Sequence, residues 1–199
     1  MHLIGLLGGV ASGKSFVARQ LAEWGAGVLD ADRAAHEVLR EPATEQAARA
    51  RWGERVFGLD GRIDRSKLAQ VVFPTLPEGV KERAYLEKLI HPEVGRRLRA
   101  EARRLAEGGT LAAVLDAPLL LEAGWDNLCS SLLFVDAPRS VRVARALARG
   151  WTEEDFSARE GAQESLDSKR MRADVVVDNS GTPEETRAQI ERFWHSLVG

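Results

Sequence analysis

Short apolar runs alternate along this chain with longer segments in which apolar residues recur every three or four positions. The short runs lack polar alternation, which is typical of parallel strands covered on both faces, whereas the longer segments have the spacing of amphipathic helices. Repeated alternation of strand and helix predicts a doubly wound α/β domain, with a five-stranded parallel sheet flanked by helices. The predicted strands are residues 3–7, 27–29, 111–115, 132–135 and 175–177.

The first and last predicted helices have the clearest boundaries. The first begins near Gly13, ends near Gly25 and turns inward Val17, Ala18, Leu21 and Trp24. The last begins after Thr182, with Pro183 in its first position and Glu185 completing a capping box. Its apolar stripe predicts core packing and consists of Ile190, Phe193, Trp194 and Leu197.

The segment between the second and third predicted strands contains no strand pattern and is too long for a single crossover helix. It predicts a helical insertion at about residues 33–108, with helices at about 31–40, 45–52, 65–72, 78–89 and 92–107. His91 and Pro92 mark the junction of the last two, because proline fits the first turn of a helix. Residues 149–172 are polar with few apolar anchors, which predicts either a mobile lid or a surface excursion.

Composition narrows the class of protein. The 199 residues are 44 % hydrophobic and 29 % charged, which excludes a disordered or collagen-like chain. A formal net charge of −2 gives no global attraction to nucleic acid or membranes, and no apolar stretch approaches the roughly 20 residues that span a bilayer. With Cys129 as its single cysteine and no signal-peptide pattern, the chain is expected in a reducing, cytoplasmic compartment without a cysteine-based zinc site.

A complete G-x-x-x-x-G-K-[ST] motif lies between the first predicted strand and the first predicted helix. It consists of Gly8, Gly9, Val10, Ala11, Ser12, Gly13, Lys14 and Ser15. The glycines allow the backbone to turn and aim its N–H groups at phosphate oxygens, and the dipole of the helix that follows favours the same anion. Lys14 can reach the β- and γ-phosphates, and the Ser15 hydroxyl can ligate Mg²⁺. The motif therefore predicts binding of a nucleoside triphosphate with Mg²⁺.

The remaining motifs favour a small-molecule kinase over other phosphate-loop proteins. A GTPase needs an N-K-x-D or T-K-x-D motif, which the sequence lacks, and its D-x-x-G match at residues 178–181 comes too late for a switch region. Motor and transporter ATPases are normally larger or are modules of longer chains. A small-molecule kinase needs a site for the phosphate acceptor and arginines that close over the transferring phosphoryl group.

Carboxylates follow the second and third predicted strands, at the edge where parallel sheets bind their ligands. Asp32 can hold an acceptor hydroxyl and take its proton, although Asp30 or Asp32 can instead cap the next helix. Asp116 can contact the groups that ligate Mg²⁺ without being a ligand itself. The alternative is that it only forms part of a turn at the end of the strand. Glu122 can bind substrate or remain a solvated carboxylate.

Arginines are candidates for stabilising phosphoryl charge, because their forked donors bind oxyanions bidentately. Arg142, Arg145 and Arg149 share one face of a predicted helix, and Arg159 follows in the predicted lid. Arg149 ranks first for this role, ahead of Arg145 or Arg159, against the alternative of a solvated face. The arginines of residues 96–104 are interspersed with glutamates, which indicates a solvated helix, with an anion-facing surface as the alternative.

Taken in order, these motifs resemble the dephospho-coenzyme A kinases nearly end to end. The matching stretches are the phosphate loop at residues 4–15, a D-A-D…H element at 30–36, an L-x-x-I-x-H-P-like stretch at 86–92 and a D-x-P-L-L-x-E element at 116–122. The last part of the chain is similar to the family's closing pattern, with matches at Arg159, Gln163, Lys169 and residues 173–174 and 179–181. Leu7, Ala11 and Phe16 depart from its usual residues. Ala11 replaces a glycine, which raises the question of whether that position needs a positive φ.

The resemblance implies a single P-loop kinase domain over residues 1–199 that transfers the γ-phosphoryl group of ATP to the ribose 3′-hydroxyl of dephospho-coenzyme A. The implied catalytic residues are Lys14, Asp32 and Arg149. The implied nucleotide-binding residues are Gly8, Gly9, Val10, Ala11, Ser12, Gly13, Lys14, Ser15, Phe16, Arg145 and Asn179. The implied acceptor-binding residues are Asp32, His91, Leu119, Glu122 and Arg159. Ser15 would hold Mg²⁺, with Asp116 behind it.

Two alternatives remain at this point. One is another small-molecule or nucleoside monophosphate kinase of the same fold, and the other is a nucleotide-binding regulatory protein, for which Asp32→Ala would leave function intact. The partners expected are ATP and dephospho-coenzyme A, with no nucleic acid and no membrane. We expect a monomer or a weak homo-oligomer.

Overall fold

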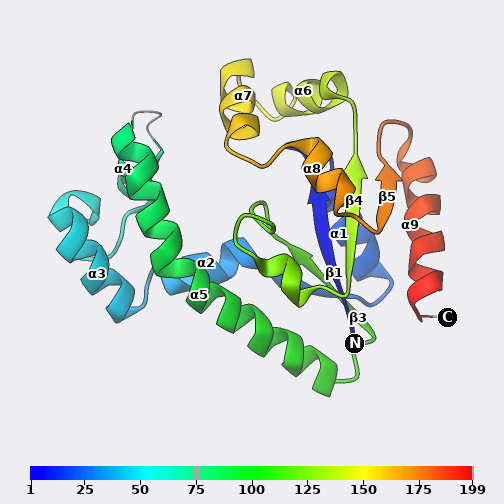
Figure 1. Cartoon of the computed structure of the whole chain (residues 1–199), viewed down its shortest axis with the longest axis horizontal. Helices are drawn as coiled ribbons and strands as arrows, with labels where there is room; N and C mark the ends of the chain where they lie inside the picture. Colours follow the sequence, from blue (N-terminus) through cyan, green and yellow to red (C-terminus); the bar gives the residue numbers. More distant parts are fainter. Residues whose placement is uncertain (74–76, 199) are drawn as a thin grey trace. The chain divides into compact units, whose positions relative to one another are not determined.

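A computed structural model describes residues 1–73 and 77–198, and the chain divides into two compact units (Figure 1). The sheet unit comprises Met1–Asp30 together with the chain from Ala100 onward. The helical unit comprises Ala31–Arg99. The phosphate loop therefore belongs to the sheet unit, whereas Asp32 and His91 belong to the helical unit.

The sheet unit is built on a five-stranded parallel sheet with the strand order β2-β3-β1-β4-β5. Its strands are β1 (His2–Gly8), β2 (Gly27–Asp30), β3 (Ala112–Asp116), β4 (Ser131–Asp136) and β5 (Val175–Asp178). All five strand predictions are confirmed to within one residue at each end. The prediction succeeds because the inner strands are buried on both faces, so their sequences are apolar without alternation.

Two helices pack on each other and on the sheet, α1 (Lys14–Glu23) and α9 (Pro183–Val198). Val17, Leu21 and Ile190 are fully buried between them and the strands, and each such side chain stabilises the fold by about 1.5–3 kcal/mol. The predicted capping box of α9 is confirmed. The Glu185 N–H donates to Thr182 Oγ1 at 3.3 Å, and the Thr182 N–H donates to Glu185 Oε2 at 2.8 Å.

Beyond the carboxyl end of β4 the chain forms α6 (Arg139–Leu147), α7 (Glu153–Gly161) and α8 (Leu166–Met171), shown at the top of Figure 1. The sequence shows few apolar anchors in residues 149–172, yet Phe156 of α7 is completely buried. Its ring packs with Ala146 of α6 and with Val10 of the phosphate loop. A single aromatic side chain thus ties this polar segment to the loop.

The helical unit contains α2 (Ala31–Val38), α3 (Pro42–Trp52), the short helix η1 (Gly53–Val56), α4 (Arg65–Val72) and most of α5 (Pro77–Glu107). A second short helix, η2 (Trp125–Leu128), lies in the sheet unit. Within the helical unit, α3 and α5 are joined through Glu82. Its carboxylate accepts from Trp52 Nε1 at 2.7 Å and pairs with Arg51 at 2.8 Å.

The predicted helix junction at His91 and Pro92 is wrong, because α5 runs without a break through Pro92 for 31 residues. An internal proline removes one backbone hydrogen bond and costs about 3 kcal/mol. Val94 and Leu98, which follow Pro92 on the same helix, are almost completely buried. Burying two such side chains contributes about 3–6 kcal/mol, which offsets the cost of the proline.

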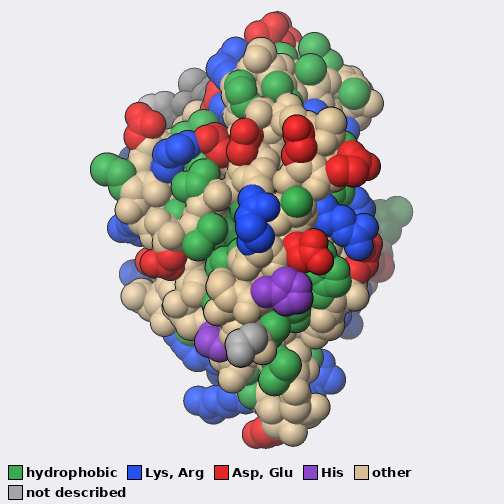
Figure 2. All heavy atoms as spheres, turned by 90° about the vertical axis from the view of Figure 1, so that its right-hand side faces the viewer, with side chains coloured by type: hydrophobic (Ala, Val, Ile, Leu, Met, Phe, Trp, Pro, Cys, Tyr) green, Lys and Arg blue, Asp and Glu red, His purple; other side chains and the backbone are tan. Residues whose placement is uncertain are grey.

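Acidic and basic side chains are interspersed over the face of the molecule that carries α9 (Figure 2), in keeping with the net charge of −2. Such mixing cancels the long-range field that steers polyanions toward a protein. Within residues 1–73 and 77–198, no helix combines the length and the apolar character required to cross a membrane.

Candidate functional site

The phosphate loop leaves β1 at Gly8 and enters α1 at Lys14. Gly8 and Gly13 have φ angles of 145° and 103°, which side chains rarely tolerate. Ala11 has a φ of 58°, the only positive φ of a non-glycine residue in the part of the chain that the structure describes. The position where this sequence replaces the family's glycine therefore does adopt the left-handed conformation.

This strain gives a stability prediction. A left-handed conformation costs an L-residue about 1–2 kcal/mol, whereas glycine costs about 0.4–1 kcal/mol through the entropy of the unfolded chain. We expect Ala11→Gly to raise the free energy of unfolding by up to about 1 kcal/mol in urea denaturation. Ala148, in right-handed helical conformation at the end of α6, is the matched control, and Ala148→Gly should destabilise. Equal destabilisation by the two substitutions would contradict strain at Ala11.

Two predicted nucleotide-binding residues, Arg145 and Asn179, hold the backbone of the loop. Both donate to the carbonyl oxygen of Ser12, from Arg145 Nη1 at 3.2 Å and from Asn179 Nδ2 at 2.7 Å. Thr186 orients the Asn179 amide by donating to its Oδ1 at 3.0 Å. Because the peptide group is planar, fixing the Ser12 carbonyl also fixes the direction of the Gly13 N–H. A Cβ on Gly13 would lie 2.0 Å from Asn179 Nδ2, so this packing requires glycine.

The three arginines predicted on one face of α6 have different surroundings. Arg142 is buried, and its guanidinium donates to the Val10 carbonyl at 3.4 Å and pairs with Glu160 of α7 at 2.6 Å. Arg145 is half-buried against the loop, whereas Arg149 is exposed. The predicted shared helix face is wrong for Arg149, because α6 ends at Leu147 and Arg149 lies in the turn that follows it. Arg142 and Arg145 of α6 therefore brace the phosphate loop, and Arg149 is an exposed cation after the helix.

Other predicted site residues lie along the sheet unit. Arg159 is exposed, with its guanidinium 4.3 Å from the centre of the Trp151 ring. Phe16 packs partly against the core from α1, and Leu119 is half-buried after β3. Ser15 is exposed in the first turn of α1.

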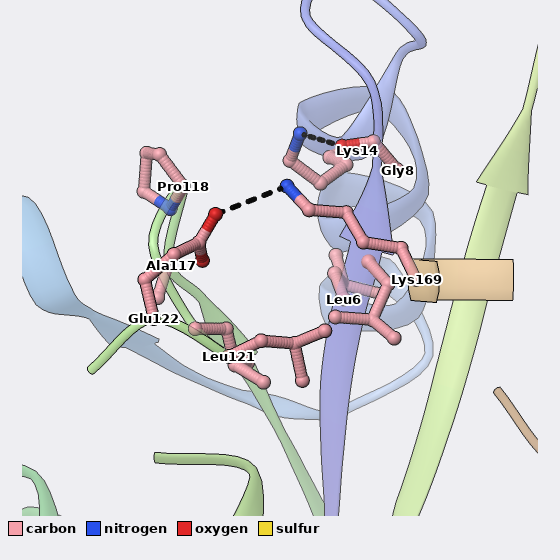
Figure 3. Close-up of a pocket in the computed structure, with 10 residues that line it drawn as sticks. Leu6, Gly8, Lys14, Ala117, Pro118, Leu121, Glu122 and Lys169 are labelled. Atoms are coloured by element: carbon pink, nitrogen blue, oxygen red, sulfur yellow. Dashed lines mark hydrogen bonds and ion pairs between the residues drawn. The ribbon is translucent and has the colours of Figure 1, made fainter. Parts of the chain in front are cut away.

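A small cavity opens beside the loop in the sheet unit (Figure 3). Its lining residues are Leu6, Leu7, Gly8, Lys14, Ala117, Pro118, Leu120, Leu121, Glu122 and Lys169. Lys14 Nζ donates to the carbonyl oxygens of Gly8 at 3.0 Å and Gly9 at 3.3 Å. Figure 3 shows the Lys14 and Lys169 side chains entering this space, with Glu122 facing Lys169. The arrangement presents two ammonium groups where the loop would receive phosphates.

Burial lowers the pKa of Lys14 from 10.5 to about 8, an effect that the carboxylate of Asp116 opposes and the ammonium of Lys169 reinforces. Phosphate oxygens would stabilise the charged form and raise this pKa again. Without nucleotide, Lys14 therefore loses its proton as the pH rises through about 8. Bound nucleotide would keep Lys14 protonated to a higher pH.

We expect ATP affinity to weaken by about tenfold or more between pH 7.5 and pH 9.5, since binding above pH 8 requires proton uptake. Titration calorimetry in buffers of different ionisation enthalpy measures both the affinity and the protons taken up. Circular dichroism at pH 9.5 verifies that the protein is still folded. A flat affinity profile over this range would contradict the lowered pKa of Lys14.

Aspartates end four of the five strands. Asp30 pairs in register with Asp116 across β2 and β3, and Asp136 pairs with Asp178 across β4 and β5. Asp116 is close enough to Lys14 to raise its pKa. Carboxylates thus line the edge of the sheet that carries the phosphate loop, as expected for the ligand side of a parallel sheet.

The helical unit carries two of the predicted acceptor-binding residues. Asp32 is exposed in the first turn of α2, directly after β2 and Asp30. His91 is half-buried within α5. Its pKa is lowered by burial, which the carboxylate of Glu87 partly opposes, so His91 is neutral at pH 7.

Comparisons with known proteins agree on one family. The family model described as dephospho-CoA kinase matches residues 2–185. A dephospho-CoA kinase of Thermobifida fusca is 41% identical over 99% of this chain and 96% of its own length. One from Geobacillus kaustophilus is 42% identical, over 98% of this chain and 97% of its own length. The chain belongs to the dephospho-CoA kinase family.

Solved structures show the same fold. The crystal structure of TT1252 from Thermus thermophilus is 40% identical, has a TM-score of 0.82 and covers 100% of this chain and 98% of that one. A dephospho-CoA kinase from Campylobacter jejuni, 18% identical with a TM-score of 0.67, covers 99% of this chain and 97% of its own, and shares the fold. The predicted P-loop kinase fold is confirmed, and a different kinase family is not favoured.

Two residues at the phosphate loop were not assigned a catalytic or binding role from the sequence, although Arg142 was one of the candidate arginines and Lys169 lies in the family's closing pattern. Lys169 is 2% exposed and lines the cavity beside Lys14, and Arg142 is equally buried against Val10. A compositional signal exists for Lys169, because the chain has 23 arginines but only 5 lysines, so a lysine in the polar segment 149–172 is unusual. For Arg142 the helical periodicity identified the face of α6, but its partners depend on tertiary contacts.

Proposed function

We propose that this protein transfers the γ-phosphoryl group of ATP to the ribose 3′-hydroxyl of dephospho-coenzyme A. The observation that carries the proposal is the complete phosphate loop with its partly buried Lys14, in a chain that belongs to the dephospho-CoA kinase family over almost its whole length. In the reaction the acceptor oxygen bonds to the γ-phosphorus, the bond from that phosphorus to the β-phosphate oxygen breaks, and ADP leaves.

The loop binds and orients the triphosphate. Its N–H groups and the amino end of α1 attract phosphate oxygens, and Lys14 donates to the β- and γ-phosphates. Arg145 and Asn179 support this role through the Ser12 carbonyl, which they hold in place. A loop held in its binding geometry needs no reorganisation as charge develops in the transition state.

The oxygen donors beside the loop fit Mg²⁺. Ser15 offers a hydroxyl and Asp116 a carboxylate, the hard ligands that Mg²⁺ prefers, and Mg²⁺ commonly takes only one or two protein ligands alongside substrate phosphates. Among the described residues no cluster of three or more His, Cys, Asp or Glu side chains could hold a metal by itself. When bound, Mg²⁺ neutralises charge on the β- and γ-oxygens. Ser15 would ligate it, with Asp116 behind.

Asp32 is the acceptor-side base of this proposal. It would accept the proton of the 3′-hydroxyl as that oxygen attacks, and the neutral His91 would contribute to the acceptor site with Leu119, Glu122 and Arg159. Arg149 would stabilise the transferring phosphoryl group as residues 149–172 close over both substrates. Closure would exclude water, whose attack on ATP would otherwise compete with the acceptor hydroxyl.

A product assay tests the proposal directly. Purified protein is incubated with ATP, Mg²⁺ and dephospho-coenzyme A, with and without chelator, and the products are read by mass spectrometry. We expect an acceptor heavier by one phosphoryl group, formed only without chelator and not formed from nucleoside monophosphates. Absence of product while ATP still binds would overturn the proposal. Light scattering on the same preparation tests the expected monomer or weak homo-oligomer.

A further inference from the structure

Lys169 places a buried ammonium group in the cavity beside the phosphate loop, next to the partly buried Lys14. It lies on α8, within the polar segment 149–172, and is only 2% exposed. Its Nζ donates to Gln163 Oε1 at 3.0 Å and lies 3.6 Å from Glu122 Oε1. Glu122 is held in turn by the Glu164 N–H, which donates to the same Oε1 at 2.8 Å. The ammonium is therefore fixed in place by groups from two separate segments of the sheet unit.

These contacts only partly compensate a buried charge. The Glu122 carboxylate lies beyond hydrogen-bonding distance of the ammonium, and the Gln163 amide is neutral. Removing a cation from water costs several kcal/mol, and an ion pair recovers this only with close, hydrogen-bonded geometry. An ammonium has three donors, so Lys169 can keep its contact with Gln163 and still donate to an additional anion.

The cavity brings two cationic side chains together. Its charged lining residues are Lys14, Lys169 and Glu122, and the carboxylate of Asp116 also lies close enough to Lys14 to act on it. Figure 3 shows both lysine side chains directed into the same space, one from the phosphate loop and one from α8. Lys14 reaches the β- and γ-phosphates of a nucleotide bound to such a loop, so the terminal phosphoryl group would lie next to the ammonium groups that meet at this small cavity.

We propose that Lys169 is a second cation that binds the γ-phosphoryl group of ATP beside the phosphate loop, together with Lys14. The inference rests on the proposed kinase function, because it assigns the two ammonium groups to the transferring phosphoryl group. Lysine suits the position because its compact ammonium fits beside Lys14, where the planar guanidinium of the far commoner arginine would need more room.

Calorimetric binding of ATP and of ADP, each with Mg²⁺ and without acceptor, tests the proposal. We expect Lys169→Met to weaken ATP by about 10- to 100-fold, the effect of one lost charge-assisted hydrogen bond, and ADP by no more than about threefold. Lys81→Met, which removes an exposed lysine of the helical unit, is the control and should change neither affinity. Unchanged ATP affinity, or equal weakening of ATP and ADP, would assign Lys169 a purely structural role.

Thermal unfolding establishes that each variant is folded. If Lys169→Met fails to fold, Lys169→Gln takes its place, because it keeps a polar donor without the charge, and the same selective loss of ATP affinity is expected. The measurement is independent of the acceptor. A wild-type protein that makes no product from dephospho-coenzyme A would overturn the proposed function, whereas the ATP-to-ADP ratio would still decide the role of Lys169.

Discussion

Replacing Lys14 by methionine is expected to lower kcat/KM for ATP by about 10³-fold, the scale of losing a donor aimed at charge that develops in the transition state. Methionine has a similar length and apolar character along its stem, so the change removes the ammonium with little change in packing. The loss should fall on both ATP affinity and kcat, because the ammonium contacts phosphates in the ground state and in the transition state. Steady-state kinetics with dephospho-coenzyme A as acceptor measures both.

The same substitution is expected to leave the fold intact and to stabilise it. Burial lowers the Lys14 pKa from 10.5 to about 8, so at neutral pH the folded protein holds this ammonium at a cost of about 3 kcal/mol. Methionine removes that cost but also leaves the Gly8 and Gly9 carbonyls without the Lys14 donor. We expect the free energy of unfolding to rise by about 1–2 kcal/mol at pH 7.

Lys81→Met serves as the matched control, because Lys81 is exposed on α5 and distant in sequence from the loop. It should change neither kinetics nor stability by more than about 0.5 kcal/mol. A Lys14→Met protein that is both inactive and destabilised by several kcal/mol would show that Lys14 is mainly structural. A Lys14→Met protein that keeps its activity would show that the phosphate loop does not act in the reaction as proposed.

The parts of the fold that local physics controls could be predicted from the sequence. Each apolar run is a strand because central parallel strands are buried on both faces, and Thr182 with Glu185 starts α9 because the two cap each other. The phosphate loop could also be recognised from the sequence, because its backbone needs glycine at Gly8 and Gly13, where φ is positive. At Ala11 the sequence left open whether φ is positive, and the structure shows a φ of 58°.

The errors and omissions arise where tertiary contacts outweigh a local rule. Pro92 normally marks a helix start, yet the burial of Val94 and Leu98 carries α5 through it. Phe156 reads as one aromatic residue in a polar segment, but its partner Val10 is far away in sequence. Partners so distant leave no periodic signal that a single sequence could reveal.

For polar side chains too, the sequence indicates which residues lie near the site, whereas their partners depend on tertiary contacts. Arg145 and Asn179 are predicted to bind the nucleotide, and in the structure both donate to the Ser12 carbonyl of the phosphate loop, a contact with the backbone that sequence motifs do not distinguish from contact with the nucleotide. Lys169 belongs to the family's closing pattern, but the sequence assigns it no role, and its burial next to Lys14 and Glu122 makes it a candidate for the site. Family motifs therefore locate the site more reliably than they assign its interactions.

Replacing Asp32 by asparagine is the second substitution for which we expect a large effect. If Asp32 accepts the proton of the attacking hydroxyl, kcat should fall by about 10²- to 10⁴-fold, the range for loss of a general base. ATP affinity should change by no more than about twofold, because the proposal places Asp32 on the acceptor hydroxyl and not on the triphosphate, which the phosphate loop binds. The free energy of unfolding should change little, because the side chain is exposed at the start of α2.

Asp30→Asn is the comparison that shows which of the two aspartates accepts the proton. Asp30 lies two residues earlier and directly precedes α2, and asparagine is as good a helix cap as aspartate. We therefore expect Asp30→Asn to retain most of the activity that Asp32→Asn loses. The reverse pattern would assign the proton to Asp30 and leave Asp32 at the helix start, where a carboxylate interacts favourably with the helix dipole. Full activity in both variants would mean that the acceptor hydroxyl loses its proton without help from either carboxylate, so that positioning and charge stabilisation at the phosphate loop carry the catalysis.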